Sequence, residues 1–434
     1  MKKTLLSAAL IATCLSASAQ KLNFIPWTEN GYLTGTHISD NGKYVAGSDK
    51  GGQAFIYNTE TGEIKYYADP MIGEETDYST NSDVRSITND GTGVGFMAEQ
   101  PAKYDFATGT SQKISGQNEA EAGLYNYISA DGKTMAGMRW NGMFYRAPVI
   151  NINGTEEYLP SPKASWLGWK EYMGCCITAG NSDGSVLMGY ILDNYGVQTL
   201  GFWTLNDDDK TYSVVPAAKK YYDGSAALDG PQPYDNFSGA AMSSNGKWAV
   251  IEYHDKTDYT KGNAIARYDI ETDAVEYITC PLADNSIEYY ATGISDEGTI
   301  VGYIQNKSNF DRKGFIVQGD ENEAKLLADV YPDVKEWATL DTNSFNTPCG
   351  ITPDGRYIVG FGFVDYNETS LCYGTYWFDA EGETSGVSNI KSGKANKVNE
   401  SFSIDGRKVS TASPMRNNMV INKYDNGEVK KIIK

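Results

Sequence analysis

A short motif that recurs seven times constrains the fold of this sequence more than any other feature. In most copies a turn, usually Asp-Gly or Asn-Gly, separates an Ile-Ser/Thr segment from an apolar run that often ends in Gly and an aromatic residue, as in ITPDGRYIVGFG from Ile351. The seven turn glycines are Gly42, Gly91, Gly132, Gly184, Gly246, Gly298 and Gly355. A repeat of about 50 residues is typical of propeller blades, in which each repeat buries its apolar faces against its neighbours.

The residues around each turn predict four strands per repeat. An Asp-Gly pair between apolar runs predicts a tight two-residue hairpin turn, and a second hairpin follows, as in AFIYNTETGEIKYY from Ala54. Helical periodicity is absent. We therefore expect an all-β fold, a seven-bladed β-propeller over residues 21–383, followed by a linker and a short C-terminal β-hairpin appendage over residues 384–434. The last blade lacks a clear fourth strand, and LNFIPW from Leu22 is expected to supply it.

The repeats resemble two known types. ITPDGRYIVGFG and ISADGKTMAGM are similar to the S-P-D-G-K repeats of TolB-like and WD-like propellers, and the VGY of ISDEGTIVGYI is similar to the extracellular HAF repeat. This resemblance spans residues 36–380 and implies an architecture, not an activity.

The N-terminus has the three parts of a secretory signal peptide over residues 1–20. Lys2 and Lys3 precede an apolar core that is too short to span a bilayer, and Ala17-Ser18-Ala19 forms the cleavage site. An alternative is lipidation at Cys14, because Ile11 to Cys14 loosely resembles a lipobox. Either reading predicts export.

The C-terminal tail resembles the sorting domain of type IX secretion substrates in Bacteroidetes. The matching residues are Ile404, Asp405, Gly406, Arg407, Val409, Ile421, Asp425, Gly427, Lys430 and Lys431. The resemblance implies a secreted or cell-surface protein, with peripheral association at the cell surface. If the tail is only a β appendage without a sorting role, the periplasm is the expected location.

Composition narrows the ligand classes. The net charge of −19 repels phosphate backbones, so we expect no nucleic-acid partner. Two histidines and few, scattered cysteines predict no metal site and no cofactor; Cys349 and Cys372 could form a disulfide, although buried free thiols are the main expectation. We expect a monomer.

Candidate binding residues lie in the long connections between blades and in the second connection within blades. Both types emerge on the face opposite the Asp-Gly turns, where variable loops on a rigid scaffold commonly bind ligands. Aromatic rings in polar insertions have no blade interface to fill and can stack on sugars or anchor a protein. The candidate ligand-binding residues are Trp166, Trp169, Tyr172, Tyr221, Tyr222, Tyr234 and Asp235.

Two functions remain open from the sequence. The first is a non-catalytic exported propeller that binds a glycan or a protein through the long connections. The second is a polysaccharide hydrolase or lyase that uses carboxylates on the same face; the carboxylates considered are Glu74, Glu75, Asp77, Asp223, Asp229, Asp235 and Asp333. No catalytic residue can be assigned, because the sequence contains no recognisable nucleophile elbow or Ser-His-Asp order.

Overall fold

The computed structural model describes two parts of the chain in separate ranges. The first comprises residues 19–25, 33–49, 52–67, 81–116, 122–141, 145–161, 172–193, 198–216, 232–233, 241–254, 264–284, 286–332, 334, 347–367 and 370–383. The second comprises residues 398–403, 408–409, 419–424 and 429–433. The chain divides into two compact units accordingly, with residues 19–383 forming one of them.

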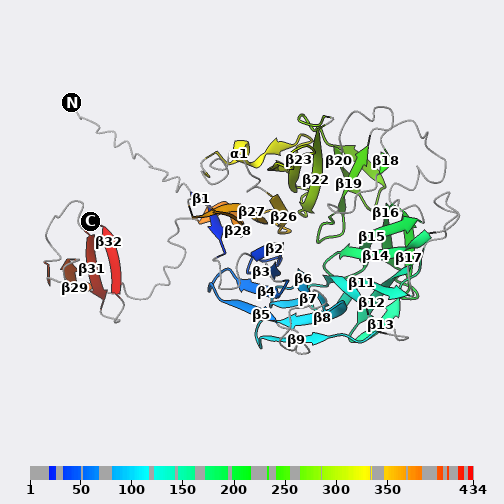
Figure 1. The fold of residues 1–434 in the computed structure, drawn as a ribbon, viewed down its shortest axis with the longest axis horizontal. Helices are drawn as coiled ribbons and strands as arrows, with labels where there is room; N and C mark the ends of the chain where they lie inside the picture. The colour runs from blue at the N-terminus through cyan, green and yellow to red at the C-terminus, as the bar shows by residue number, and fades with distance from the viewer. Residues whose placement is uncertain are drawn as a thin grey trace, which may run out of the picture. The chain divides into compact units, whose positions relative to one another are not determined.

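The described residues of 19–383 form seven antiparallel four-stranded blades arranged in a ring (Figure 1). Residues of the innermost strands line a channel at the centre of the ring. Blades 1 to 3 consist of β2 Leu33–Ile38, β3 Tyr44–Asp49, β4 Ala54–Asn58, β5 Ile64–Tyr67, β6 Ser82–Ile87, β7 Thr92–Met97, β8 Gln100–Asp105, β9 Thr110–Lys113, β10 Gly123–Ile128, β11 Thr134–Asn141, β12 Tyr145–Ile152 and β13 Thr155–Tyr158. Blades 4 to 6 consist of β14 Tyr172–Gly180, β15 Val186–Asp193, β16 Gln198–Leu205, β17 Tyr212–Pro216, β18 Gln232–Pro233, β19 Trp248–His254, β20 Ala264–Asp269, β21 Ala274–Tyr277, β22 Ile287–Ile294, β23 Ile300–Asn306, β24 Arg312–Val317 and β25 Lys325–Leu326. One parallel bridge, from Arg146 to Gly174, joins blades 3 and 4 into a single eight-stranded sheet.

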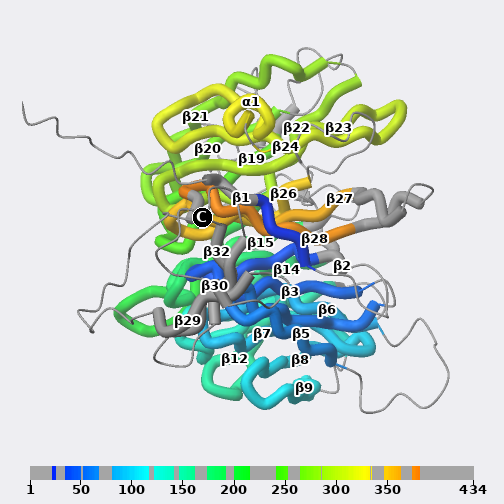
Figure 2. Tube along the Cα trace, turned by 90° about the vertical axis from the view of Figure 1, so that its left-hand side faces the viewer, coloured from blue at the N-terminus to red at the C-terminus, as the bar shows by residue number. Residues whose placement is uncertain are grey.

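Blade 7 is built from both ends of the propeller. It contains β26 Thr347–Ile351, β27 Tyr357–Asn367 and β28 Ser370–Glu383, and β1 Ala19–Phe24 pairs with β28 as the outermost strand (Figure 2). Leu22 lies opposite Phe378 in this pairing. The expected closure by the segment that begins at Leu22 is therefore confirmed, and it joins the two ends of the ring.

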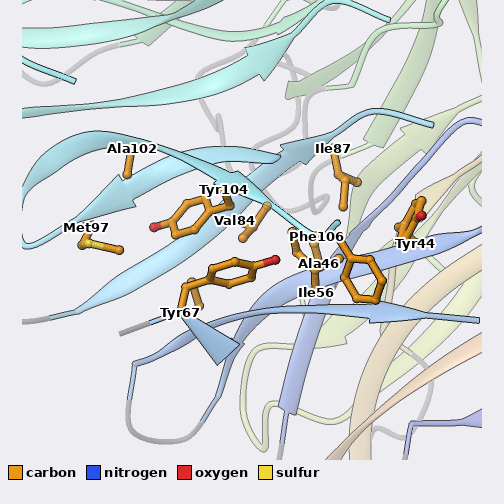
Figure 3. Packing of buried hydrophobic residues seen from close by; sticks show 11 residues of the cluster. Tyr44, Ala46, Ile56, Tyr67, Val84, Ile87, Met97, Ala102, Tyr104 and Phe106 are labelled. Atoms are coloured by element: carbon orange, nitrogen blue, oxygen red, sulfur yellow. The ribbon is translucent and has the colours of Figure 1, made fainter. Parts of the chain in front are cut away.

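The core lies between blades, because each sheet has two faces to cover. Between blades 1 and 2, the rings of Tyr67 and Tyr104 meet edge to face at 5.2 Å, and those of Tyr44 and Phe106 meet at 5.1 Å (Figure 3). Such aromatic pairs add to the free energy gained by burying apolar surface. Many of the chain's tyrosines therefore serve the scaffold.

The repeated turn is longer than the sequence predicted. In blade 1, β2 ends at Ile38 and β3 begins at Tyr44, so five residues connect them, and the expected two-residue turn is wrong. The amide of Gly42 donates to the carbonyl of Ser39, and Gly42 has a φ of +72°, which favours glycine. The Ser39 hydroxyl donates to Asn41 Oδ1 and accepts from the amide of Tyr44. The Ser/Thr and Asp/Asn of the motif thus hold the turn through their side chains.

The rest of the chain adds two small features. A four-residue helix, α1 Leu327–Val330, interrupts the all-β pattern, and no described helix is long and apolar enough to cross a membrane. The C-terminal part is more than the expected hairpin. It is a four-stranded antiparallel sheet in the order β30-β29-β31-β32, formed by β29 Val398–Ser403, β30 Lys408–Val409, β31 Met419–Tyr424 and β32 Val429–Ile433.

Candidate binding site in the central channel

A β-bulge recurs at one position of the innermost strand. In six blades one residue, six positions before the turn glycine, is left out of the pairing between the first and second strands. We call these six residues the bulge ring: Thr36, Arg85, Asn126, Thr178, Thr292 and Cys349. The corresponding position of blade 5, residue 240, lies outside the described residues. Because a bulge redirects side chains, the same defect in each blade supplies the channel with a ring of different, mostly polar, groups.

The same bulge explains the second glycine of the motif, which is the glycine that follows the apolar run. Gly137 of β11 lies opposite the residue before the bulge, and a Cβ there would be 2.0 Å from the carbonyl oxygen of Leu124. In blade 2, a Cβ at Gly95 would likewise be 1.9 Å from the carbonyl oxygen of Asp83. In blade 7, a Cβ at Gly360 would be 2.4 Å from the carbonyl oxygen of Thr347, which confirms the expectation that this glycine permits close backbone packing. The sequence motif thus encodes the bulge as well as the turn.

The bulge ring separates two cavities along the channel. The turn-side cavity, of about 270 Å³, is bounded by the connections between first and second strands, including Asp40, Ser244 and Pro353. The loop-side cavity, of about 650 Å³, lies toward the connections between second and third strands and includes Arg146 and Arg312. All six bulge-ring residues line both cavities.

Hydrogen bonds tie the turn-side end together. The amide of Ser182 donates to the carbonyl of Ser244 at 2.6 Å, and the amide of Asp296 donates to the carbonyl of Pro353 at 2.8 Å. Ser244 also donates through its hydroxyl to Asp40 Oδ2 at 3.2 Å, which links blade 5 to blade 1 across the channel. Burial raises the pKa of both Asp40 and Asp296. This end is therefore narrowed and braced by the protein's own groups.

The loop-side cavity contains three arginines. Arg85 forms an ion pair with Asp83, with 2.7 Å between Nε and Oδ2. Arg146 donates through Nη1 to the hydroxyl of Tyr190, and its Cζ lies 5.1 Å from the Trp140 ring centroid and 5.6 Å from that of Tyr190. Such cation–π contacts hold a guanidinium in place without neutralising it.

Arg312 is held in the same manner on the other side of the channel. Its Nε donates to Gln305 Oε1 at 2.8 Å, and its Cζ lies 4.6 Å from the Tyr303 ring centroid. The ring of Tyr303 is itself stacked on that of Tyr290, with centroids 5.2 Å apart. The aromatic stack fixes the position of the guanidinium.

Two further titratable groups face the bulge ring. Burial, with a smaller effect from Arg85, lowers the pKa of His37 to about 3, so this histidine is neutral at physiological pH. Burial raises the pKa of Asp83 to about 6, and Arg85 opposes that rise. Asp83 Oδ1 is buried and has no hydrogen-bond partner among the described residues. Asp83 therefore changes charge near neutral pH.

The described residues provide neither a metal cluster nor a disulfide. Within them, no group of three His, Cys, Asp or Glu side chains is placed to hold a metal ion. Cys349 is a free thiol in the bulge ring, which contradicts the alternative of a disulfide with Cys372. Burial raises the pKa of the Cys349 thiol to about 12, so it is protonated at physiological pH.

Apart from the backbone of Tyr172, the site residues predicted from sequence fall in segments that the structure does not describe. Trp166, Trp169, Tyr221, Tyr222, Tyr234 and Asp235 lie outside the described residues, as do the side chain of Tyr172 at the start of β14 and all seven loop carboxylates. The sequence reasoning missed the bulge ring and the cavity arginines. An alignment of the seven repeats on their turn glycines would have shown the ring, because the sixth position before that glycine is Thr, Arg, Asn or Cys in the six blades concerned.

Comparisons with known proteins support the fold. No protein-family model and no curated protein matches the sequence. Among solved structures, an oligogalacturonate lyase from Vibrio parahaemolyticus matches 83% of this chain and 93% of its own, at 13% identity and a TM-score of 0.50. TolB from Acinetobacter baumannii matches 66% of each chain, just under two thirds, at 14% identity and a TM-score of 0.39.

These similarities concern the fold. The molecule is a β-propeller. Identities of 13–14% carry no inference about activity, substrate or partner, so the function must be argued from the cavity itself.

Proposed function

We propose that this protein is an exported, non-catalytic glycan-binding propeller whose ligand enters the loop-side cavity. The observation that carries the proposal is the cavity itself, about 650 Å³ in volume and lined by hydroxyl, amide, guanidinium and aromatic groups. Ligand pockets of this kind have volumes of about 300–1,000 Å³. Export rests on the signal peptide over residues 1–20, and the tail over residues 384–434 favours the cell surface.

A glycan fits this cavity better than a folded protein does. The bulge ring offers hydroxyls from Thr36, Thr178 and Thr292 and an amide from Asn126, which can exchange hydrogen bonds with sugar hydroxyls. The Asn126 amide already donates to the carbonyl of Ile177 at 2.8 Å, which fixes its orientation. The surface of a folded protein would not reach the bulge ring, because the ring lies inside the channel between the two cavities. A sugar chain entering end-on would reach them.

The enzymatic alternative has one specific observation in its favour. Glu252 is a buried carboxyl whose pKa is raised well above its ordinary value by burial, with Glu288 contributing in the same direction. A protonated carboxyl beside an ionised one is the arrangement that glycosidases use. However, Glu252 accepts from the amide of Ala291, and Glu288 pairs with Lys307 at 2.8 Å. Glu252 Oε2 has no hydrogen-bond partner among the described residues, but neither carboxyl is among the described residues that line the loop-side cavity, and we favour the binding function.

The test is a binding and turnover screen on the mature protein. An oligosaccharide panel is assayed for binding by calorimetry and for cleavage by chromatography. We expect binding without products, and we expect Thr178→Phe, which fills the bulge ring, to weaken binding at least tenfold. Thr61→Phe, on an exposed turn of blade 1, is the matched control and should leave binding unchanged. Cleavage that Glu252→Gln abolishes would instead establish the enzyme.

The long connections require their own test. The Trp166→Ala, Trp169→Ala double variant should weaken binding of the same oligosaccharide if the connection between β13 and β14 contributes to the site. Unchanged binding, together with a loss in Thr178→Phe, would restrict the site to the channel. Unchanged binding in both variants would refute the proposed location.

A further inference from the structure

The six arginines of residues 19–383 divide into two groups by their ion pairing. Four have a carboxylate partner: Arg85 with Asp83, Arg139 with Glu156, Arg267 with Glu276 and Arg356 with Asp379, at 2.6–3.0 Å. Arg146 and Arg312 have no carboxylate within ion-pair distance among the described residues. Both line the loop-side cavity. The chain has 56 acidic residues and a net charge of −19, so acids are plentiful, and yet these two guanidiniums in one cavity have no carboxylate partner in the part of the chain that the structure describes.

Each of these two arginines leaves one bidentate edge unused by the described residues. Arg146 donates through Nη1 to Tyr190, which leaves the Nε and Nη2 edge. Arg312 donates through Nε to Gln305, which leaves the Nη1 and Nη2 edge. A planar guanidinium edge matches the two oxygens of a carboxylate in a paired hydrogen bond.

The two arginines are on different sides of the channel. Arg146 belongs to β12 of blade 3 and Arg312 to β24 of blade 6, and these blades lie across the ring from each other (Figure 1). A ligand that satisfies both must therefore present two separate anionic groups. Arg85 lies between them in the bulge ring, but Asp83 already neutralises it.

We infer that the loop-side cavity binds an acidic oligosaccharide that places one uronate carboxylate on Arg146 and another on Arg312. The inference rests on the proposed glycan-binding function and names its substrate class. Between the two arginines the bulge ring presents neutral hydroxyl and amide groups, which suit the hydroxyls of the intervening sugar. An acidic peptide would also carry carboxylates, but its apolar side-chain atoms cannot form hydrogen bonds with the hydroxyls of the bulge ring.

The primary test compares one ligand with its neutral counterpart. The mature protein is titrated by calorimetry with oligosaccharides of galacturonic acid and of glucuronic acid, and with the same oligosaccharides after reduction of their carboxyls to alcohols. We expect binding of at least one uronate series and a loss of at least a hundredfold on carboxyl reduction, since two charge-assisted bidentate contacts disappear. Because this comparison needs no variant, it cannot fail through misfolding. Equal affinity for both forms would overturn the inference.

The variants assign the contacts. Arg146→Met and Arg312→Met should each weaken uronate binding roughly tenfold to hundredfold, and the double variant should abolish it. Arg146→Lys and Arg312→Lys keep the positive charge but lose the bidentate guanidinium edge, so they should retain part of the affinity. Arg356→Met, which removes an arginine that pairs with Asp379 at 2.8 Å, is the matched control and should bind as the parent does. Unchanged binding in the folded double Met variant would overturn the assignment.

Three further ligands distinguish this inference from the alternative ligand classes. A poly-glutamate peptide or a sulfated neutral oligosaccharide that bound more tightly than every uronate would refute the uronate assignment. A neutral oligosaccharide that bound in the cavity at least as tightly as every uronate, as judged by Thr178→Phe, would refute the inference and leave the proposed function intact. If no oligosaccharide bound at all, both would be refuted.

Discussion

Blade 3 contains two arginines on adjacent strands in opposite environments, one between blades and one on the channel wall. Arg139 of β11 is fully buried; its guanidinium pairs with Glu156 at 3.0 Å and donates to the carbonyl of Ile114 at 2.8 Å. Arg146 of β12 is only partly buried and is held by aromatic rings and one hydroxyl. Arg139 and its partners, between blades, are satisfied within the protein, whereas Arg146 and its partners, on the loop-side wall, keep capacity for a ligand. The first set maintains the scaffold, and the second set is available for binding.

The largest expected effect tests this contrast directly. Arg139→Leu leaves Glu156 buried without a counter-charge and also removes a partner from a network that includes the Tyr125 hydroxyl. We expect the free energy of unfolding to fall by about 3–5 kcal/mol. Arg146→Leu should change it by less than about 1 kcal/mol, because its site is partly solvated. Chemical unfolding followed by circular dichroism measures both free energies. Equal losses in the two variants would show that Arg139 and Arg146 do not differ in their contribution to the scaffold.

The next effect concerns the backbone that builds the channel wall. Gly137→Ala would place a Cβ 2.0 Å from the Leu124 carbonyl oxygen, so the bulge of blade 3 must shift. We expect a destabilisation of about 1–3 kcal/mol from the overpacking. Gly350→Ala is the control, since the nearest atom to its Cβ would be 3.5 Å away. If both variants had the same unfolding midpoint, the close approach would not be the reason for the second glycine of the repeat.

A smaller effect compares hydroxyls in the turn and in the bulge ring. The buried Ser129 hydroxyl donates to Asp131 at 2.8 Å and accepts from the amide of Thr134 at 2.9 Å. Ser129→Ala should therefore cost about 1–2 kcal/mol. Thr178 makes one long contact, 3.4 Å to the carbonyl of Met188, so Thr178→Val should cost less than about 0.5 kcal/mol. Thermal unfolding of both variants decides whether the Thr178 hydroxyl contributes to the stability of the fold.

The sequence predicted the scaffold well because the scaffold repeats. A turn glycine such as Gly355 occurs in every blade, and the missing fourth strand of the last blade predicted that the segment at Leu22 completes it. Both features follow from local chemistry. The candidate site could not be predicted in the same way. Arg146 and Arg312 are ordinary strand residues in sequence, and only the closed ring brings blades 3 and 6 to one cavity. Their lack of a carboxylate partner among the described residues depends on distances that no spacing reveals, and the predicted loop aromatics lie outside those residues.

The smallest effect is a pH dependence of ligand affinity. Burial raises the pKa of Asp83 to about 6, so this carboxyl gains a proton as the pH falls from 7.5 to 5.5 and no longer neutralises Arg85. Among the described residues of this wall, His37, with a pKa of about 3, stays neutral, and burial raises the pKa of the Cys176 and Cys349 thiols to about 12. The charged groups that line the same cavity with Asp83 are Arg85, Arg146 and Arg312.

The cavity therefore becomes more positive on acidification, while uronate carboxylates remain ionised. We expect the affinity for an acidic oligosaccharide to rise on the order of fivefold between pH 7.5 and pH 5.5. Asp83→Asn should bind at pH 7.5 as the parent does at pH 5.5, with a flat profile, when measured by calorimetry in matched ionic strength. An affinity that fell on acidification, or a pH dependence that survived in Asp83→Asn, would show that the wall charge is set by another group. In that case Arg85 would belong with the paired arginines of the scaffold and not with the binding wall.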